Sequence, residues 1–87
     1  MNYPFWKEKM KIRLWAIDND MWNVVQLGFT IEVPQAPTDL EKKLIQMDAQ
    51  AKDEIGGHLS RAQLIRYRQY ETAKDLWDVL EKINEGV

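Results

Sequence analysis

The segment Thr72–Glu85, TAKDLWDVLEKINE, carries the clearest structural signal in the chain. Its apolar residues recur every three or four positions, which places their side chains on one face of an α-helix. This stripe consists of Ala73, Leu76, Trp77, Leu80 and Ile83. Thr72 can cap the start of such a helix, and Gly86 is a typical residue at its end. The segment therefore predicts an amphipathic helix that buries Trp77.

Residues 2–17 also have a helical period, but their apolar residues lie on two faces. One face holds Trp6, Met10, Leu14 and Ile17. The nearly opposite face holds Phe5, Ile12 and Ala16, and Trp15 falls on neither. Asn2 can cap this helix, and Pro4 is tolerated in its first turn. Because a surface helix needs only one apolar stripe, we expect this helix to be central or to have a second partner.

The residues between these segments predict three more helices. Asp18-Asn19-Asp20 can cap a short helix that contains Trp22 and ends at Gly28. Two capping boxes, Thr38-x-x-Glu41 and Ser60-x-x-Gln63, predict the starts of a third and a fourth helix. The apolar stripe of the third helix is Leu40, Leu44, Met47, Ala51 and Ile55.

The segment 29–37 contains two prolines and several β-branched residues. We predict an extended connector here, and a short edge strand is the alternative, which would lack a partner strand. The five predicted helices, joined by this connector and by short turns, indicate an all-α, compact bundle.

Composition limits the functions open to the chain. Its 87 residues allow one small domain, and a net charge of −2 with a pI of about 5.3 argues against a dedicated polyanion binder. The chain has no cysteine, which excludes a disulfide, a thiol nucleophile and a zinc knuckle within it. No signal peptide or membrane-spanning run is visible, so we expect no membrane contact and a cytoplasmic location.

Catalytic chemistry has little support in the sequence. The single histidine, His58, follows Gly56-Gly57, and we expect a structural role near the end of the third helix. Asp18 and Asp20 fit a helix cap better than a calcium loop, because the required glycine and glutamate are not at the right spacing. We therefore expect no enzyme, no cofactor and no metal site.

Two surfaces are candidates for binding. Phe5, Ile12 and Trp15 are candidate self-association residues. Phe5 and Ile12 belong to the second apolar face of the first helix, which needs a partner, and Trp15 is an unplaced tryptophan beside it, a residue type common at interfaces. Arg61, Arg66 and Arg68, interleaved with Tyr67 and Tyr70, are candidates for contact with single-stranded RNA. The alternative for these arginines is an ordinary helix surface, with the tyrosines closing the core.

A third candidate for binding is a groove lined by tryptophans that holds a short apolar peptide.

The order and spacing of several motifs resemble the Gag polyprotein of plant copia-type LTR retrotransposons. The motifs are Asn2-Tyr3-x-x-Trp6-Lys7-x-x-Met10 with Leu14, Trp22-x-x-Val25-x-x-Gly28, Ala51-Lys52 with Ile55 and Leu59, and Thr72-Ala73-Lys74-x-x-Trp77-x-x-Leu80-Glu81 ending at Glu85-Gly86. The resemblance covers almost the whole chain. It implies the amino-terminal part of a capsid-type domain, an all-helical fold, self-assembly into virus-like particles and packaging of element RNA.

From this resemblance we expect residues 1–87 to be one helical capsid-type domain, a fragment of a longer polyprotein. The family's zinc knuckle lies further downstream and is absent from this sequence, so element RNA is expected to bind this fragment only weakly. The main expected partner is a second copy of the chain, through a weak dimer contact. A live element and a copy retained by a host are both compatible with the sequence.

The residues expected to hold the fold are those of the helical stripes. They are Trp6, Met10, Leu14, Leu44, Ala51, Ile55, Leu76, Trp77 and Leu80. The predicted function is structural self-assembly through protein–protein contacts. Peptide binding and RNA binding are the alternatives.

Overall fold

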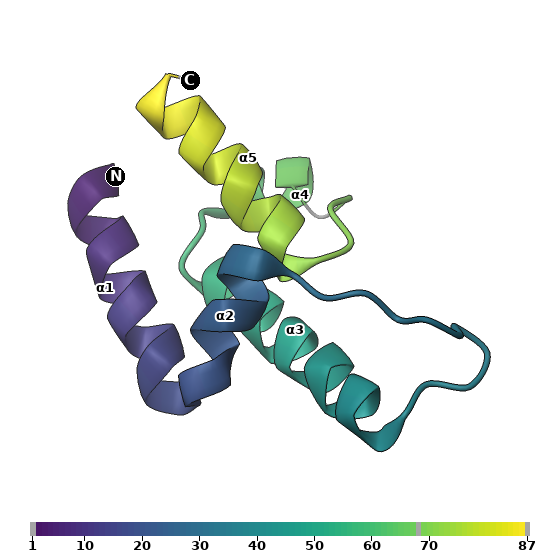
Figure 1. The fold of residues 1–87 in the computed structure, drawn as a ribbon. Coiled ribbons are helices and arrows are strands. Elements are labelled where there is room, and N and C mark those ends of the chain that lie inside the picture. The colour runs from purple at the N-terminus through teal and green to yellow at the C-terminus, as the bar shows by residue number, and fades with distance from the viewer. Residues whose placement is uncertain (1, 68, 87) are drawn as a thin grey trace.

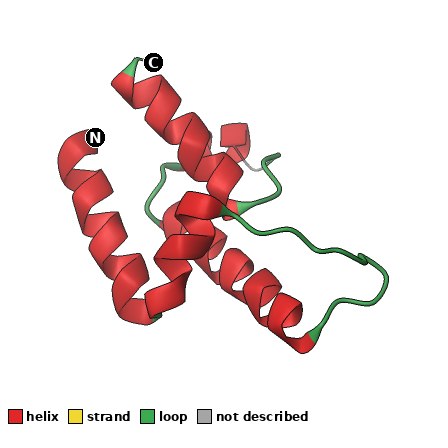
Figure 2. Cartoon of the chain, in the orientation of Figure 1, coloured by secondary structure: helices red, strands yellow, loops and turns green. Residues whose placement is uncertain are grey.

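The computed structural model describes residues 2–67 and 69–86. In this part of the chain, five segments form α-helices and none forms a strand, as Figures 1 and 2 show. The helices are α1 (Tyr3–Ile17), α2 (Asn19–Leu27), α3 (Asp39–Gly57), α4 (Arg61–Tyr67) and α5 (Ala73–Glu85). The all-α bundle predicted from the sequence is confirmed, and residues 29–37 form the predicted connector without strand structure.

Each helix begins where a polar side chain satisfies a backbone N–H of the first turn, which would otherwise lack a partner. Asn2, Asp18 and Thr72 accept hydrogen bonds from Phe5, Asp20 and Asp75 N–H, respectively. The pairs Thr38/Glu41 and Ser60/Gln63 form the two reciprocal capping boxes. The predicted starts of all five helices are therefore confirmed.

Two helices end at glycines with a left-handed φ angle, Gly28 at 71° and Gly86 at 70°. At Gly28 the absence of a side chain has a second effect, because a Cβ atom would lie 2.9 Å from Cδ of Lys74 in α5. A larger residue would thus both strain the backbone and crowd the Lys74 side chain.

The core is built around Trp77 of α5, whose exposed fraction is only 2%. The ring of Trp6 in α1 stacks on Trp77 at 5.7 Å, and the ring of Trp22 in α2 meets it edge-on at 5.2 Å. Aromatic pairs at these distances contribute more than area burial alone. Trp77 therefore joins α5 to two helices that are far from it in the sequence.

A buried polar contact fixes the start of α5 against α3. The Asp48 carboxylate accepts a hydrogen bond from the backbone N–H of Ala73 at 2.7 Å, and Asp48 is only 9% exposed. The nearby Lys52 ammonium donates to the backbone carbonyl of Glu71 at 2.7 Å. The loop that precedes α5 is thus held at two points by the middle of α3.

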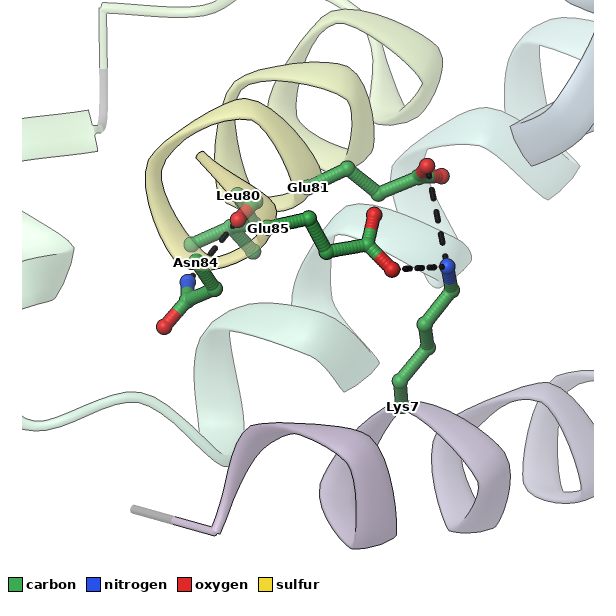
Figure 3. Close-up of polar contacts among 5 residues, drawn as sticks. All are labelled: Lys7, Leu80, Glu81, Asn84 and Glu85. Carbon is green, nitrogen blue, oxygen red and sulfur yellow. Dashed lines mark hydrogen bonds and ion pairs between the residues drawn. The ribbon is translucent and has the colours of Figure 1, made fainter. Parts of the chain in front are cut away.

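An ion pair ties the first turns of α1 to the last turns of α5. Figure 3 shows Lys7 Nζ between the carboxylates of Glu85, at 3.0 Å, and Glu81, at 3.6 Å. The Glu85 hydrogen bond is the main cause that raises the pKa of Lys7 above its usual value. On the same turn of α5, Asn84 donates to the backbone carbonyl of Leu80.

Three residues predicted to be buried are exposed instead. Ile17, Leu40 and Ile83 expose 49%, 67% and 50% of their surface. Each lies in the first or last turn of its helix, beyond the point where neighbouring helices cover the stripe. Figure 1 shows the start of α3 extending away from the other helices toward the connector. The radius of gyration, 13.2 Å, exceeds the roughly 12 Å expected for this length because of such extensions.

The other expected core residues are buried, except that Trp6, Leu44 and Met47 are half-buried. Trp6 packs against the core cluster. Within the described residues, no helix combines the length and the apolar character needed to cross a membrane.

Candidate interaction surface

The outer face of α1 exposes three large apolar side chains. Phe5, Ile12 and Trp15 are 61%, 62% and 59% exposed, whereas Met10 and Leu14 on the inner face are 2% or less. Seven residues make nearly two helical turns, so Phe5 and Ile12 project in the same direction, and Trp15 follows one turn later. The structure therefore brings the three predicted self-association residues to one side of the molecule.

This face is uncovered because α1 lies at one side of the bundle, as Figure 1 shows. Its inner face packs against α2 and α3. A helix at the side of a small bundle has neighbours for one stripe only. The sequence nevertheless provides two, and the second one remains in contact with solvent.

The basic residues of α1 point in different directions. Lys7 pairs with α5, Arg13 pairs with Glu54 of α3 at 2.9 Å, and Lys11 lies 5.3 Å from the ring centre of Trp22. The Lys9 ammonium lies 5.1 Å from the ring centre of Phe5, a cation–π distance. These four cations do not form one stripe that could follow a phosphate backbone.

A hollow of about 530 Å³ lies beside this face, between α1 and the end of α3. Its walls are formed by Asn2, Phe5, Trp6, Lys9, Met10, Ile12, Arg13 and His58. The volume is within the range of small-ligand pockets, and the lining combines apolar side chains with cationic ones. This combination suits an apolar group that carries a carboxylate.

The presence of His58 in the wall of this hollow could not be predicted from the sequence. His58 is at the C-terminal cap of α3, as expected, and its Nε2 lies 3.5 Å from the carboxylate of Glu54. Arg13 contacts the same carboxylate, so α1 and α3 meet across Glu54. His58 and Arg13 are far apart in the sequence, and no local motif connects them.

The candidate RNA surface is only partly assembled. Arg61 and Arg66 are exposed on α4, and Arg68 lies outside the described residues. Tyr67 is 7% exposed and belongs to the core cluster, with the half-buried Tyr70 packed against it. The guanidinium of Arg66 lies 5.7 Å from the centre of the Tyr67 ring. A buried ring cannot stack on a base, so Tyr67 closes the core, which is the alternative weighed from the sequence.

Comparisons of the chain with known protein families, with curated proteins and with solved structures found no match. The resemblance to copia-type Gag therefore remains a hypothesis that depends on the motifs alone.

Proposed function

We propose that the chain is a structural self-assembly module of the capsid type, as the resemblance to copia-type Gag implies. In this proposal copies associate through protein–protein contacts, as in virus-like particles, and the chain performs no catalysis. Element RNA contributes little through this chain, given the net charge of −2 and the dispersed cations.

The observation that carries the proposal is the second apolar face of α1. Isolated apolar residues on a protein surface are common, but three large ones along one side of a helix form a patch. The all-helical fold also agrees with what the resemblance implies. A capsid module must contact copies of itself, and a closed two-fold dimer is the commonest arrangement.

Sedimentation of the purified chain over a concentration series up to millimolar tests this proposal. The parent chain should associate as its concentration rises. The double variant Ile12→Asp, Trp15→Asp should keep its helicity and remain monomeric, because the two new charges oppose contact between two apolar faces.

The matched control is Leu27→Asp with Val33→Asp, since these residues are 70% and 52% exposed but lie outside α1. The control should associate like the parent. A parent chain that stays monomeric at millimolar concentration would contradict the proposal. An Ile12→Asp, Trp15→Asp chain that unfolds would assign the face to the core.

The hollow between α1 and α3 supports a second candidate, a module that binds a short apolar peptide with an acidic group. Its apolar lining and its basic residues Lys9, Arg13 and His58 are the observations in its favour. Titration of a monomeric chain with a peptide such as acetyl-Leu-Glu-Leu-Leu, followed by tryptophan fluorescence, tests it. Saturable binding that Lys9→Glu weakens would favour this candidate over self-assembly.

A further inference from the structure

Four residues on the outer face of α1 have the spacing of a coiled-coil seam. Phe5, Glu8, Ile12 and Trp15 are separated by three, four and three positions, the alternation that forms one narrow strip along a helix. All four are exposed. We name this strip the α1 seam. Its length is about one and a half heptads, and Glu8 is its charged residue.

The charge in the seam requires a partner. Within residues 2–67 and 69–86, Glu8 takes part in none of the ion pairs, although Lys7, Arg13 and Lys74 each have a carboxylate partner. Any helix that covers Phe5, Ile12 and Trp15 also removes water from Glu8, because Glu8 lies between them. A charge in such a position costs free energy unless a cation meets it. The occupant of the seam must therefore supply a basic group near its centre.

A second copy of α1 in the antiparallel direction supplies such a group. If the two-fold axis passes near Met10, Phe5 of each copy lies opposite Trp15 of the other, and Glu8 lies opposite Ile12. Lys11 flanks the seam on the same edge as Glu8, and antiparallel pairing brings these edges together. Glu8 then lies within about one residue rise, 1.5 Å along the axis, of Lys11 of the second copy.

The parallel arrangement lacks this complementarity. Equivalent residues would face each other across the seam, so the two Glu8 carboxylates would meet, and like charges at such positions are unfavourable. Lys11 is half-buried, with its ammonium beside the ring of Trp22. It is available for the antiparallel pair because it has no carboxylate partner among the described residues.

We propose that the α1 seam pairs antiparallel with the α1 seam of a second copy, with two reciprocal Glu8–Lys11 ion pairs beside an apolar strip. This proposal rests on the proposed function and specifies the contact that it uses. The three apolar side chains, each more than half exposed, offer on the order of 300 Å² per copy, well below a standard interface. The dimer is therefore weak and reversible.

Charge exchange tests the pairing. Glu8→Lys and Lys11→Glu are expected to weaken the dimer about tenfold each, because each places like charges at both pairs. The double variant Glu8→Lys, Lys11→Glu should restore the parent dissociation constant to within about threefold. The matched control is the charge exchange Lys43→Glu with Asp53→Lys, at two exposed positions of α3. This control keeps the net charge of the chain and should leave the dissociation constant unchanged.

Cysteine crosslinking tests the direction, and the chain has no native cysteine that could interfere. A mixture of Phe5→Cys and Trp15→Cys chains should form a mixed disulfide, because the two positions lie opposite each other. The mixed dimer also keeps one intact Phe5–Trp15 pair at its other end. Neither variant alone should crosslink, since its two cysteines would be at opposite ends of the seam.

The outcomes separate this proposal from the proposed function. If each cysteine variant crosslinks with itself and charge exchange fails to restore the dimer, the antiparallel arrangement is wrong, while association through α1 still holds. If the Ile12→Asp, Trp15→Asp variant associates as well as the parent, both proposals are wrong. Restoration together with a mixed disulfide supports both.

Discussion

Trp77 and Trp15 are the same residue type on two helices of similar length, and their surroundings are opposite. Trp77 is 2% exposed and touches tryptophans from α1 and α2, whereas Trp15 is 59% exposed on the outer face of α1. The difference lies in the number of apolar faces that each helix carries. α5 carries one broad stripe, and α1 carries two with neighbours for only one.

This contrast teaches that an apolar residue supports the fold only where the bundle provides a neighbour. The stripe of α5 packs on α2 and α3, so its centre holds the core together. The outer residues of α1 contribute little to the folded monomer and are free to contact another molecule. Stability and association should therefore respond separately to substitutions on the two helices.

The largest expected effect is from Trp77→Ala. Truncation of a buried tryptophan costs about 3–5 kcal/mol, which is a large part of the stability of a small domain. The variant should lose cooperative thermal unfolding, as measured by circular dichroism. A variant that melts within a few degrees of the parent would place Trp77 outside the core and remove the contrast.

The second prediction concerns the buried carboxylate under α5. Asp48→Ala leaves the Ala73 N–H without its acceptor and should cost about 1–3 kcal/mol in the free energy of unfolding. Asp48→Asn keeps an oxygen that can accept this hydrogen bond and carries no charge. Denaturant unfolding of both variants measures the difference, and an Asn variant that is as unstable as the Ala variant would show that the hydrogen bond is unimportant.

The pH dependence of Asp48 follows from the same site. Burial raises the pKa of Asp48 above its usual value, against the opposing effect of the Ala73 N–H. The folded chain then holds this proton to a higher pH than the unfolded chain. The stabilising contribution is therefore full below about pH 4 and is lost as pH rises through the raised pKa. The Asn variant should gain stability relative to the parent between about pH 4 and 7, as measured by denaturant unfolding at each pH.

A smaller effect is expected on the inner face of α1. The Tyr3 hydroxyl is buried without a hydrogen-bond partner among the described residues, and burial, with Glu85 and Glu81, raises its pKa to about 12. Tyr3→Phe removes this unsatisfied group and should leave stability at neutral pH unchanged or raised by up to about 1 kcal/mol. Above about pH 10 the parent should lose stability as the unfolded tyrosine ionises, and the Phe variant should lack this loss. A clear loss of stability at neutral pH would mean that the hydroxyl has a partner.

The smallest effect on folding is expected from Trp15→Ala. Exposed substitutions usually change the free energy of unfolding by no more than about 0.5 kcal/mol. The same variant should weaken any concentration-dependent association seen by sedimentation. A Trp15→Ala chain that is strongly destabilised would show that the outer face is part of the folded core.

Much of the fold follows from local patterns. The caps at Asn2, Asp18, Thr38, Ser60 and Thr72 and the stops at Gly28 and Gly86 depend on neighbouring residues only, and all are found as predicted. The errors at Ile17, Leu40 and Ile83 have one cause. Periodicity tells which side of a helix is apolar, but it cannot tell where the neighbouring helix ends.

Less of the candidate surface than of the fold could be predicted from the sequence. Phe5 and Ile12 could be selected because two apolar faces on one helix are visible in the sequence, and Trp15 because it falls on neither of them. The hollow with His58 and the Asp48–Ala73 contact both require residues that are distant in the sequence to meet. Such long-range contacts depend on how α3 packs against the other helices, which no local sequence pattern specifies.

The position of Trp77 in the last helix has a consequence for synthesis. A ribosome releases α1, α2 and α3 before α5, so the rings of Trp6 and Trp22 lack their cover while the chain is still growing. Exposed apolar surface of this kind makes incomplete chains prone to aggregate. Folding should therefore be completed only after α5 has been synthesised, in one step in which Trp77 packs against the rings of Trp6 and Trp22.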